Sequence, residues 1–485
     1  MLATDETVES EVAAFRQWAL VALVGLSLAV AGACAFLVHV APVFAVAAVV
    51  ASLPLVGVGI ASVVRKPSIG LIALLVLTVA LFQPDDGLLP TEVVYLLLYL
   101  IVLGTWYGSR LISGEPMTRS GTDRIALFLS VAGVGGGVLL GLVHGAPFSG
   151  ILGETIGFST ILLFLPVRDL VRTHRYGPQI VGAVLVWFGV WTSVRNMLVA
   201  YAAITGATQL WEIADVRAAY GDLPLHIGTV VAFGTAIALR GRALTLLSVA
   251  LGTVCLIGVF LAKSRGFWVD LAFALVLLFA LSPSKSRTRL VAGGVATVSF
   301  LFVPLVAVLG PVATVMLAGA LNRFTTIGNS LTADVSLINR FFETEAVWNR
   351  IQTNPVVGHG FGTPFSYHSI IAEGIMTESF IHNGFIGVWY KMGLWGLLAV
   401  VSLWVASGIG GVWASRYAPR LSRVERGLAL SAGVAVLSIL PTITTSNPFL
   451  LFDTLIVLTI TMGLAYGLFQ RGASPEPDGS EDARP

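Results

Sequence analysis

Long apolar runs recur along the chain from residue 17 to residue 470, and short polar connections separate them. Each run approaches the length of about 20 residues that an α-helix needs to cross the hydrocarbon core of a bilayer. Lipid offers the backbone no hydrogen-bonding partner, so an uninterrupted apolar run of this length predicts a helix. The pattern predicts about fourteen membrane-spanning helices. They cover residues 17–38, 42–63, 68–83, 91–109, 125–143, 150–167, 178–194, 223–239, 243–262, 267–282, 290–318, 383–409, 427–441 and 448–470.

Composition supports the same class of protein. Of the 485 residues, 56% are hydrophobic and only 11% are charged, and the mean hydropathy is +0.89. Soluble domains carry about 25% charged residues. We therefore expect an all-α polytopic membrane protein whose transmembrane domain covers residues 17–470. The first apolar run is too long for a signal-peptide core, so we expect a retained helix there.

The distribution of basic residues predicts an orientation, because cytoplasmic loops of membrane proteins carry an excess of Lys and Arg. With both termini inside, fourteen spans place most of the 28 Lys and Arg residues on the cytoplasmic side. We therefore expect a cytoplasmic segment over residues 1–16. Residues 471–485 are rich in Pro, Gly, Ser and acidic residues, so we expect a disordered cytoplasmic tail. The basic residues on the outer side are Arg195, Arg217, Lys263, Arg265, Arg323, Arg340, Arg350 and Lys391.

The longest outer segment, residues 319–382, is expected to be a large extracytoplasmic loop that carries function. Within it, residues 337–352 have the periodicity of an amphipathic helix, with Arg340 at the edge of the apolar face and Glu343 on the polar side. The apolar face consists of Leu337, Phe341, Trp348 and Ile351. Such a helix is expected to lie flat on the outer membrane surface. Arg340 would then either snorkel to the headgroups or bind a lipid diphosphate.

Two further outer segments carry residue types that bind phosphate. Ser264-Arg265-Gly266 opens a span, and the guanidinium of Arg265 presents a planar fork of donors that matches a phosphate. The alternative is an arginine that snorkels at a helix end. Residues 358–362 read Gly358-His359-Gly360-Phe361-Gly362. This sequence could cradle phosphate through backbone N–H groups, or it could form a tight turn.

His382 and Asn383 stand where the outer loop re-enters the membrane. Histidine is suited to proton transfer near neutral pH, so His382 is our candidate general base. The alternative is a pair of residues that caps the next helix. If the preceding residues are helical, Glu378 shares a face with His382 and could orient the imidazole. His359 and His368 are the next candidates for the base.

A metal site has one candidate, the outer pair Asp85-Asp86, but Asp-Asp-Gly is also an ordinary turn sequence. The long outer loop has no acidic cluster with metal-ligand spacing. We therefore expect neither a metal nor another cofactor.

The order and spacing of these pieces resemble the O-antigen ligase and polymerase family over residues 245–410. The pieces are Ser264-Arg265-Gly266, Arg340 before an aromatic helix, Asn354-Pro355 followed by Gly358, Gly360 and Gly362, His382-Asn383, and Gly393 with Gly396. The resemblance implies a membrane glycosyltransferase that takes a glycan from an undecaprenyl-diphosphate carrier on the outer face of the cytoplasmic membrane. It also implies Arg265 and Arg340 at the diphosphate and His382 at the acceptor. Arg350, Gly358, Gly360 and Asn383 are expected as further contacts to the donor or glycan.

Three functions stay open at this point. We favour a polysaccharide polymerase, which extends a lipid-linked repeat unit, over a ligase that transfers the glycan to a lipid or protein. Either enzyme is expected to invert the sugar carbon without a metal, and to work with other proteins of envelope polysaccharide assembly and with membrane lipids, not with nucleic acid. A transporter or flippase is the alternative of a different class, but the chain shows no internal repeat.

Overall fold

The computed structural model describes most of the chain. The described residues are 67–81, 90–207, 209, 212, 213, 216, 221–310, 314, 315, 318, 319, 321 and 335–473. The predicted segment 1–16, the predicted spans 17–38 and 42–63, and Asp85-Asp86 lie outside these residues. So does most of the predicted tail, from residue 474 onward.

The chain divides into two compact units, Met1–Glu115 and Pro116–Pro485. Among the described residues, the first unit contains α3 (Pro67–Leu81) and α4 (Pro90–Ser113). These two helices pack against each other, and the hydroxyls of Thr78 and Tyr95 form a buried hydrogen bond of 2.8 Å between them.

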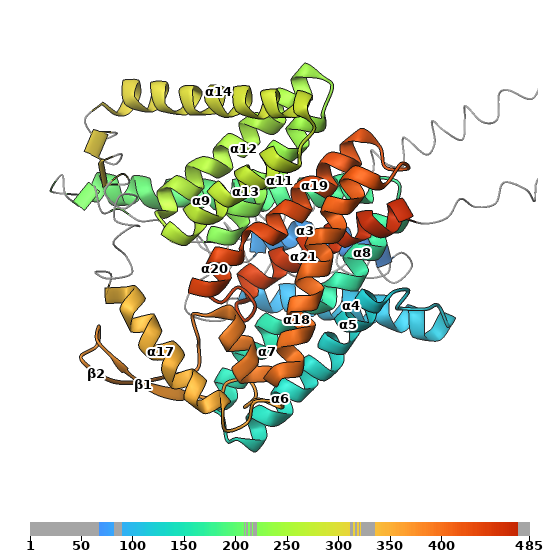
Figure 1. Cartoon of the computed structure of the whole chain (residues 1–485), viewed down its shortest axis with the longest axis vertical. Helices are drawn as coiled ribbons and strands as arrows, with labels where there is room; N and C mark the ends of the chain where they lie inside the picture. The colour runs from blue at the N-terminus through green and yellow to red at the C-terminus, as the bar shows by residue number, and fades with distance from the viewer. Residues whose placement is uncertain are drawn as a thin grey trace, which may run out of the picture. The chain divides into compact units, whose positions relative to one another are not determined.

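The second unit holds the other helices and a β-hairpin (Figure 1). Its helices up to residue 309 are α5 (Gly121–Phe128), η1 (Leu129–Gly133), α6 (Val134–Val143), α7 (Phe148–Ser159), η2 (Thr160–Leu163), α8 (Phe164–Thr173), α9 (Gly177–Gly206), α11 (Asp222–Ala238), α12 (Arg242–Ala262), α13 (Arg265–Leu281) and α14 (Ser284–Leu309). The later elements are α17 (Val335–Ile351), β1 (Phe365–Ser369), β2 (Gly374–Glu378), α18 (Gly384–Tyr417), α19 (Arg423–Ser438), α20 (Leu440–Thr445) and α21 (Phe452–Ala473).

The centre of this unit is a bundle of long helices. Helix α18 packs along α19 and α21, and α11 packs against α9, α12 and α19 (Figure 1). Helix α21 also packs against α8. The segment Arg423–Thr445, which contains α19 and α20, and helix α21 are buried over most of their length, since 78% of the most apolar 18-residue window of each is buried.

The structure confirms a mostly helical membrane-type fold. Each predicted span from 68–83 onward has a helix in the same stretch of sequence. Among the described residues, eight helices are long and apolar enough to cross a membrane, and α3 and α11 contain shorter apolar helices. The count of fourteen spans and the orientation with both termini inside stay predictions.

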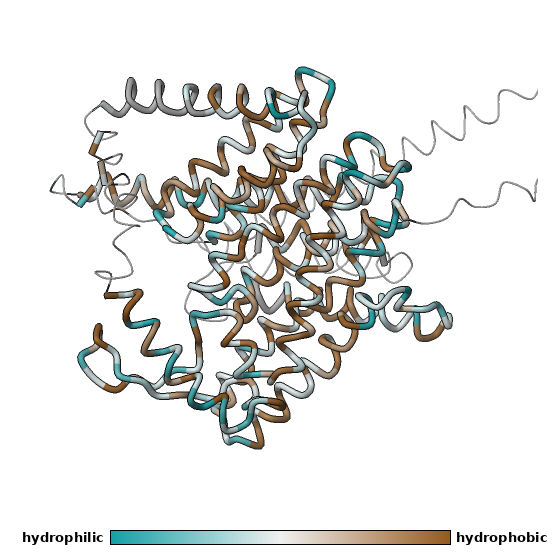
Figure 2. Tube along the Cα trace, in the orientation of Figure 1, coloured by the Kyte–Doolittle hydropathy of each residue, from teal (hydrophilic) through white to brown (hydrophobic). Residues whose placement is uncertain are grey.

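The two ends of the bundle differ in chemistry. Polar residues gather at the helix ends and in the segment around α17, while the helix bodies are mostly apolar (Figure 2). At one end, the side chain of Arg168 is fully buried and lies 2.7 Å from Asp123. At the same end, Arg471 lies 3.1 Å from Glu425. Arg168 and Arg471 are among the basic residues that the charge pattern assigns to the cytoplasm, and the outer-loop elements α17, β1 and β2 lie toward the other end (Figure 1).

The prediction of an all-α protein is wrong for the outer loop. Strands β1 and β2 pair antiparallel, with Phe365 opposite Glu378 and Ser369 opposite Gly374. The burial of β1 alternates: Phe365, Tyr367 and Ser369 are buried, and Ser366 and His368 are exposed, as expected for a half-buried strand. The inner face joins a small core between α17, the hairpin and the first turns of α18. Its buried members are Val347, Ile351, Phe365, Tyr367, Ile381 and Tyr390.

Helix α17 confirms the predicted helix, and the face that it packs against the protein differs from the predicted apolar face. The residues that it buries are Asn339, Glu343, Val347 and Ile351, one helical turn apart. Phe341 and Trp348 of the predicted apolar face are 57% and 40% exposed. The polar members are buried because they have partners: Asn339 Nδ2 donates to Tyr367 Oη (3.3 Å), and Asn339 Oδ1 accepts from Ile370 N–H (3.0 Å).

Residues 358–362 form a glycine-rich turn, which packs on a break in helix α18. At Gly393 the backbone has φ 68° and ψ −174°, so Leu394 N–H donates to the carbonyl of Pro355 (3.0 Å) instead of to the preceding helical turn. The carbonyls of Tyr390 and Lys391 accept from the N–H groups of the turn, at 2.8 and 2.9 Å. The turn thereby satisfies backbone groups that a broken helix would leave unpaired.

Gly360→Ala tests the close packing of the glycine-rich turn against helix α6. Gly360 has φ +87°, and a Cβ there would lie 2.0 Å from Gly141 N. The left-handed conformation alone costs a non-glycine residue about 1–2 kcal/mol, and the overlap with backbone adds to it. We expect a clear loss of thermal stability in detergent. Gly374→Ala is the control, because the nearest atom to its Cβ would be Ala372 O at 3.8 Å. Equal stability of the two variants would contradict the described packing.

Candidate functional site

The residues of the candidate site come from different elements and lie around the short helix α20. The chain bends at Ile439, before Pro441, so α20 continues α19 only as a separate turn. The N–H of Thr442 donates to Asp270 Oδ1 of α13 (3.0 Å), which fixes one end of α20. At its other end, the carbonyls of Thr445 and Ser446 face the outer-loop elements and accept hydrogen bonds from them.

Arg340 reaches this point from α17. Its Nη1 donates to the carbonyl of Thr445. A helix C-terminus leaves carbonyls without an intrahelical partner and carries partial negative charge, so a guanidinium is stabilised there. The contact fixes one edge of a group that has five N–H donors in total.

Arg265 reaches the same point from α13. It is the first residue of that helix and is half-buried. Its neighbour Gly266 lies against α20, since a Cβ there would be 3.2 Å from Thr442 Oγ1 and 3.5 Å from Thr445 Oγ1. The structure therefore brings Arg265 and Arg340 to one short helix, although 75 positions separate them by their numbers.

His382 lies two residues before α18 and near the same end of α20. Two residues on, Gly384 N–H donates to the carbonyl of Ser446 (3.1 Å). The imidazole Nδ1 lies 2.7 Å from Glu343 Oε2, and His382 N–H donates to Glu343 Oε1 (2.6 Å). The side chain of His382 is 35% exposed, whereas that of Glu343 is 1% exposed.

The predicted role of Glu378 is wrong in its premise. Glu378 ends strand β2 and not a helix, so the four-residue spacing does not place it on a common face with His382. Glu343 makes the contacts that the sequence assigned to Glu378. The four-residue spacing of Asn339, Glu343 and Val347 could have indicated a common helix face. That face mixes polar and apolar residues, so it is recognisable as a buried face only when the hairpin that covers it is known.

Asn383 caps helix α18. Its Oδ1 accepts from Ile386 N–H (3.1 Å), which is the usual geometry of an N-cap asparagine. The capping alternative thus describes Asn383, and its predicted contact to the substrate stays a prediction.

Gly358 and Gly360 do not form an open phosphate cradle. Gly358 N–H donates to Asn354 O (3.1 Å) and Gly360 N–H donates to Lys391 O (2.9 Å). Because both donors are used within the protein, the tight-turn alternative describes this segment. These two N–H groups are therefore not available to a phosphate, and any other contact of the two glycines to the substrate stays a prediction.

Arg350 lies in the last turn of α17 and is exposed. It is ten residues from Arg340, which corresponds to about 15 Å along a helix. The two guanidinium groups therefore start from well separated positions, and the predicted contact of Arg350 to the donor or the glycan stays a prediction.

The second-ranked histidines have different surroundings. His359 is 8% exposed, its ring stacks on Tyr390, and its Nε2 lies 2.9 Å from Arg350 O. Burial, with the nearby positive charges, holds the pKa of His359 below its usual range, and the hydrogen bond to Arg350 opposes this only in part. A neutral, stacked imidazole fits a structural role. His368 lies on the exposed face of β1.

A buried ion pair contacts the glycine-rich turn and the residue after it. Lys391 Nζ lies 2.8 Å from Glu154 Oε1, with the lysine side chain fully buried and the glutamate 11% exposed. Glu154 Oε2 accepts from Gly362 N–H (2.8 Å), and Lys391 Nζ donates to Thr363 O (3.1 Å). The pair therefore joins α7, α18 and the turn.

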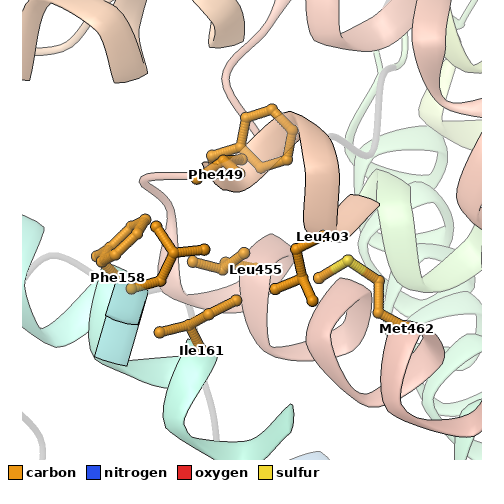
Figure 3. A pocket seen from close by; sticks show the side chains of 8 residues that line it. Phe158, Ile161, Leu403, Phe449, Leu455 and Met462 are labelled. Carbon is orange, nitrogen blue, oxygen red and sulfur yellow. The ribbon is translucent and has the colours of Figure 1, made fainter. Parts of the chain in front are cut away.

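A small apolar cavity lies deeper in the bundle, between the α7–η2 segment, α18 and α21 (Figure 3). Its lining residues are Leu129, Phe158, Ile161, Val400, Leu403, Phe449, Leu455 and Met462. Its volume of about 10 Å³ is close to that of one water-sized probe. It is therefore too small to hold a sugar or a polyprenyl chain.

Within the described ranges, no group of three or more His, Cys, Asp or Glu side chains gathers in a way that could hold a metal ion. Asp85-Asp86 is outside those ranges.

Residues 246–401 match a family model described as O-antigen ligase. The match runs from α12 into α18, so it includes Arg265, Arg340 and His382, whereas α20 follows it in the chain. No curated protein matches this chain.

The helices and the matched region together support a membrane glycosyltransferase-like protein of the ligase or polymerase class. Within that class, the resemblance to the O-antigen ligase-like family is confirmed for residues 246–401.

Glu154→Gln tests the buried ion pair. It leaves the Lys391 ammonium buried without a counter-charge, and breaking such a pair typically costs about 3–5 kcal/mol. We expect a large fall in the thermal unfolding temperature of the purified protein in detergent.

The double variant Glu154→Gln with Lys391→Met is the matched control. Removing both charges leaves no buried unpaired ion, so we expect it to recover most of the stability. A double variant as unstable as the single one would show that packing, and not charge, determines the effect.

Proposed function

We propose that this protein is a membrane glycosyltransferase that moves a glycan from an undecaprenyl-diphosphate-type carrier to an acceptor hydroxyl. Polymerisation of lipid-linked repeat units is the favoured reaction, and transfer to a lipid or protein acceptor is the ligase alternative. The observation that carries the proposal is the convergence of Arg265, Arg340 and His382 around α20, on segments that the O-antigen ligase model matches.

The donor would bind through its diphosphate. Arg340 and the N-terminus of α13 with Arg265 approach α20 from two sides, and a guanidinium pairs with phosphate oxygens in a bidentate fork. Exposed aromatic residues of α17, including Phe341, Phe342 and Trp348, would contact the lipid at headgroup depth. The polyprenyl chain would then stay in the bilayer while its diphosphate lies at the arginines.

The acceptor would be activated at His382. The acceptor oxygen attacks the anomeric carbon, its proton moves to the imidazole, and the polyprenyl diphosphate leaves with the electron pair of the broken C–O bond. Positive groups placed at the diphosphate stabilise the charge that develops there. Direct attack inverts the anomeric carbon, and these steps need no metal.

The reaction would take place on the outer face of the cytoplasmic membrane. Support for this comes from the charge pattern, which assigns the basic end of the bundle to the cytoplasm, and from the position of the candidate site at the opposite end. Glycans of the cell envelope are the substrate class that fits this location.

Arg265→Lys and Arg340→Lys test the proposal. Lys keeps the charge but cannot form the planar fork, so each variant should lose about 2.7–4 kcal/mol of transition-state stabilisation, which corresponds to about 10²- to 10³-fold in rate. The measurement is transfer from a polyprenyl-diphosphate-linked glycan by purified protein in detergent.

Arg289→Lys is the control for this pair. Arg289 is an exposed arginine of α14 near the basic end of the bundle, so its exchange should leave transfer unchanged. Near-normal rates for Arg265→Lys and Arg340→Lys would reduce both residues to membrane anchors and would remove the main support for the proposal.

A further inference from the structure

We propose that Glu343 is the positioning residue of His382 and that it fixes the imidazole as the tautomer whose Nε2 carries the lone pair. This inference rests on the proposed function, because it assigns the base of that reaction to one nitrogen atom. Glu343 itself would not touch the substrate.

Both carboxylate oxygens of Glu343 are directed at one residue. Oε1 accepts the backbone N–H of His382 at 2.6 Å, and Oε2 lies 2.7 Å from Nδ1. The first contact fixes where the chain enters α18, and the second fixes the rotation of the ring. Because α17 also donates from Arg340 to Thr445 O, the same helix sets the position of the base and of one arginine.

The chemistry of the contacts determines the tautomer. An ionised carboxylate only accepts hydrogen bonds, so Nδ1 must carry the proton that it shares with Oε2. The remaining nitrogen, Nε2, then has the free electron pair. The His382 side chain is 35% exposed, so an acceptor hydroxyl can approach it, whereas Glu343 at 1% exposure is shielded from solvent.

The proton balance of the step follows from this arrangement. The acceptor O–H gives its proton to Nε2 as the new glycosidic bond forms and the bond to the diphosphate breaks. The imidazolium that results is stabilised by the Glu343 carboxylate, as in other histidine–carboxylate pairs. The proton leaves Nε2 to solvent after transfer, which restores the neutral ring.

The groups that face this pair come from three elements. Arg340 lies on α17, Tyr367 on β1 and Glu378 on β2. Burial, and after it the charges of Glu378 and Glu343, raise the pKa of Tyr367 above its usual range. The ring of Phe380 packs edge-on against His382 at 5.1 Å. Of these groups, the Glu343 carboxylate is the one at hydrogen-bond distance from the imidazole.

Glu343→Gln is the direct test. Its amide has a single acceptor oxygen, so one of the two His382 donors meets an N–H₂ group instead. If the oxygen keeps the backbone N–H, the amide donates to Nδ1 and the proton must move to Nε2, which removes the base. We expect kcat to fall about 10²- to 10⁴-fold, the range typical of general-base catalysis. The KM for donor should stay within about twofold.

Two further variants separate positioning from folding. Glu343→Asp keeps the charge on a shorter side chain, so its kcat should recover at least about tenfold over Glu343→Gln. The double variant Glu343→Gln with His382→Ala should transfer no more slowly than His382→Ala alone, because a residue that acts through His382 has nothing left to act on.

The pH–rate profile is the readout that a purely structural role would not move. If the proton moves to Nε2 in Glu343→Gln, His382 no longer serves as the base, so residual transfer should lack the acid limb that a general base gives the wild-type profile. Glu345→Gln is the control, because Glu345 is an exposed residue of the same helix and its exchange should alter neither kcat nor the profile.

The outcomes are distinguishable from a failure of the proposed function. Wild-type protein that transfers no glycan would overturn that function and this inference with it. Wild-type protein that transfers glycan, with Glu343→Gln at the same kcat and the same profile, would overturn the inference alone. If Glu343→Gln does not fold, the His382 tautomer of the wild-type protein decides: nitrogen NMR of the labelled histidine rings that places the proton of neutral His382 on Nε2 would overturn the inference.

Discussion

The break in α18 at Gly393 is the constraint on which the outer-loop structure depends. A helix that stops within a membrane protein leaves backbone carbonyls that must find donors. Here Tyr390 and Lys391 accept from the N–H groups of His359 and Gly360, and Leu394 donates to Pro355. The outer loop is thus joined to the bundle by hydrogen bonds between backbone groups. Because these N–H groups of the glycine-rich turn donate to α18, they are not available to bind a phosphate.

The anchored turn sets the position of the other outer-loop elements. Helix α17 ends just before it, and the hairpin follows just after it, so both pack on the core formed with Tyr390. That packing rotates α17 until Glu343 faces His382 and Arg340 faces the end of α20. A single short helix thereby receives contacts from α13, α17 and α18. The buried Lys391–Glu154 pair joins α7 to α18 and to the glycine-rich turn, and so stabilises the position of the turn.

The sequence predicts the helices well because each one depends on a local property, the length and apolarity of a run. The family resemblance over residues 246–401 was also accessible, since it rests on short motifs. Glu343, Thr445 and the Lys391–Glu154 pair were not predicted, because each contact joins segments that are far apart in the chain. The hairpin was missed because its strands have only five residues each, and its alternation is recognisable only beside α17. Arg265 and Arg340 were identified by residue type, but nothing in the sequence indicates that α20 brings them together.

The central claim is that His382 is the base of a glycan transfer from a lipid diphosphate. The most direct measurement compares wild-type protein and His382→Ala with a polyprenyl-diphosphate-linked glycan in a single-turnover assay that also measures donor binding. The account predicts that wild type forms the transferred glycan and releases polyprenyl diphosphate. It predicts that His382→Ala binds the donor with similar affinity but transfers at least about 10²-fold more slowly. Transfer by His382→Ala at the wild-type rate would contradict the account.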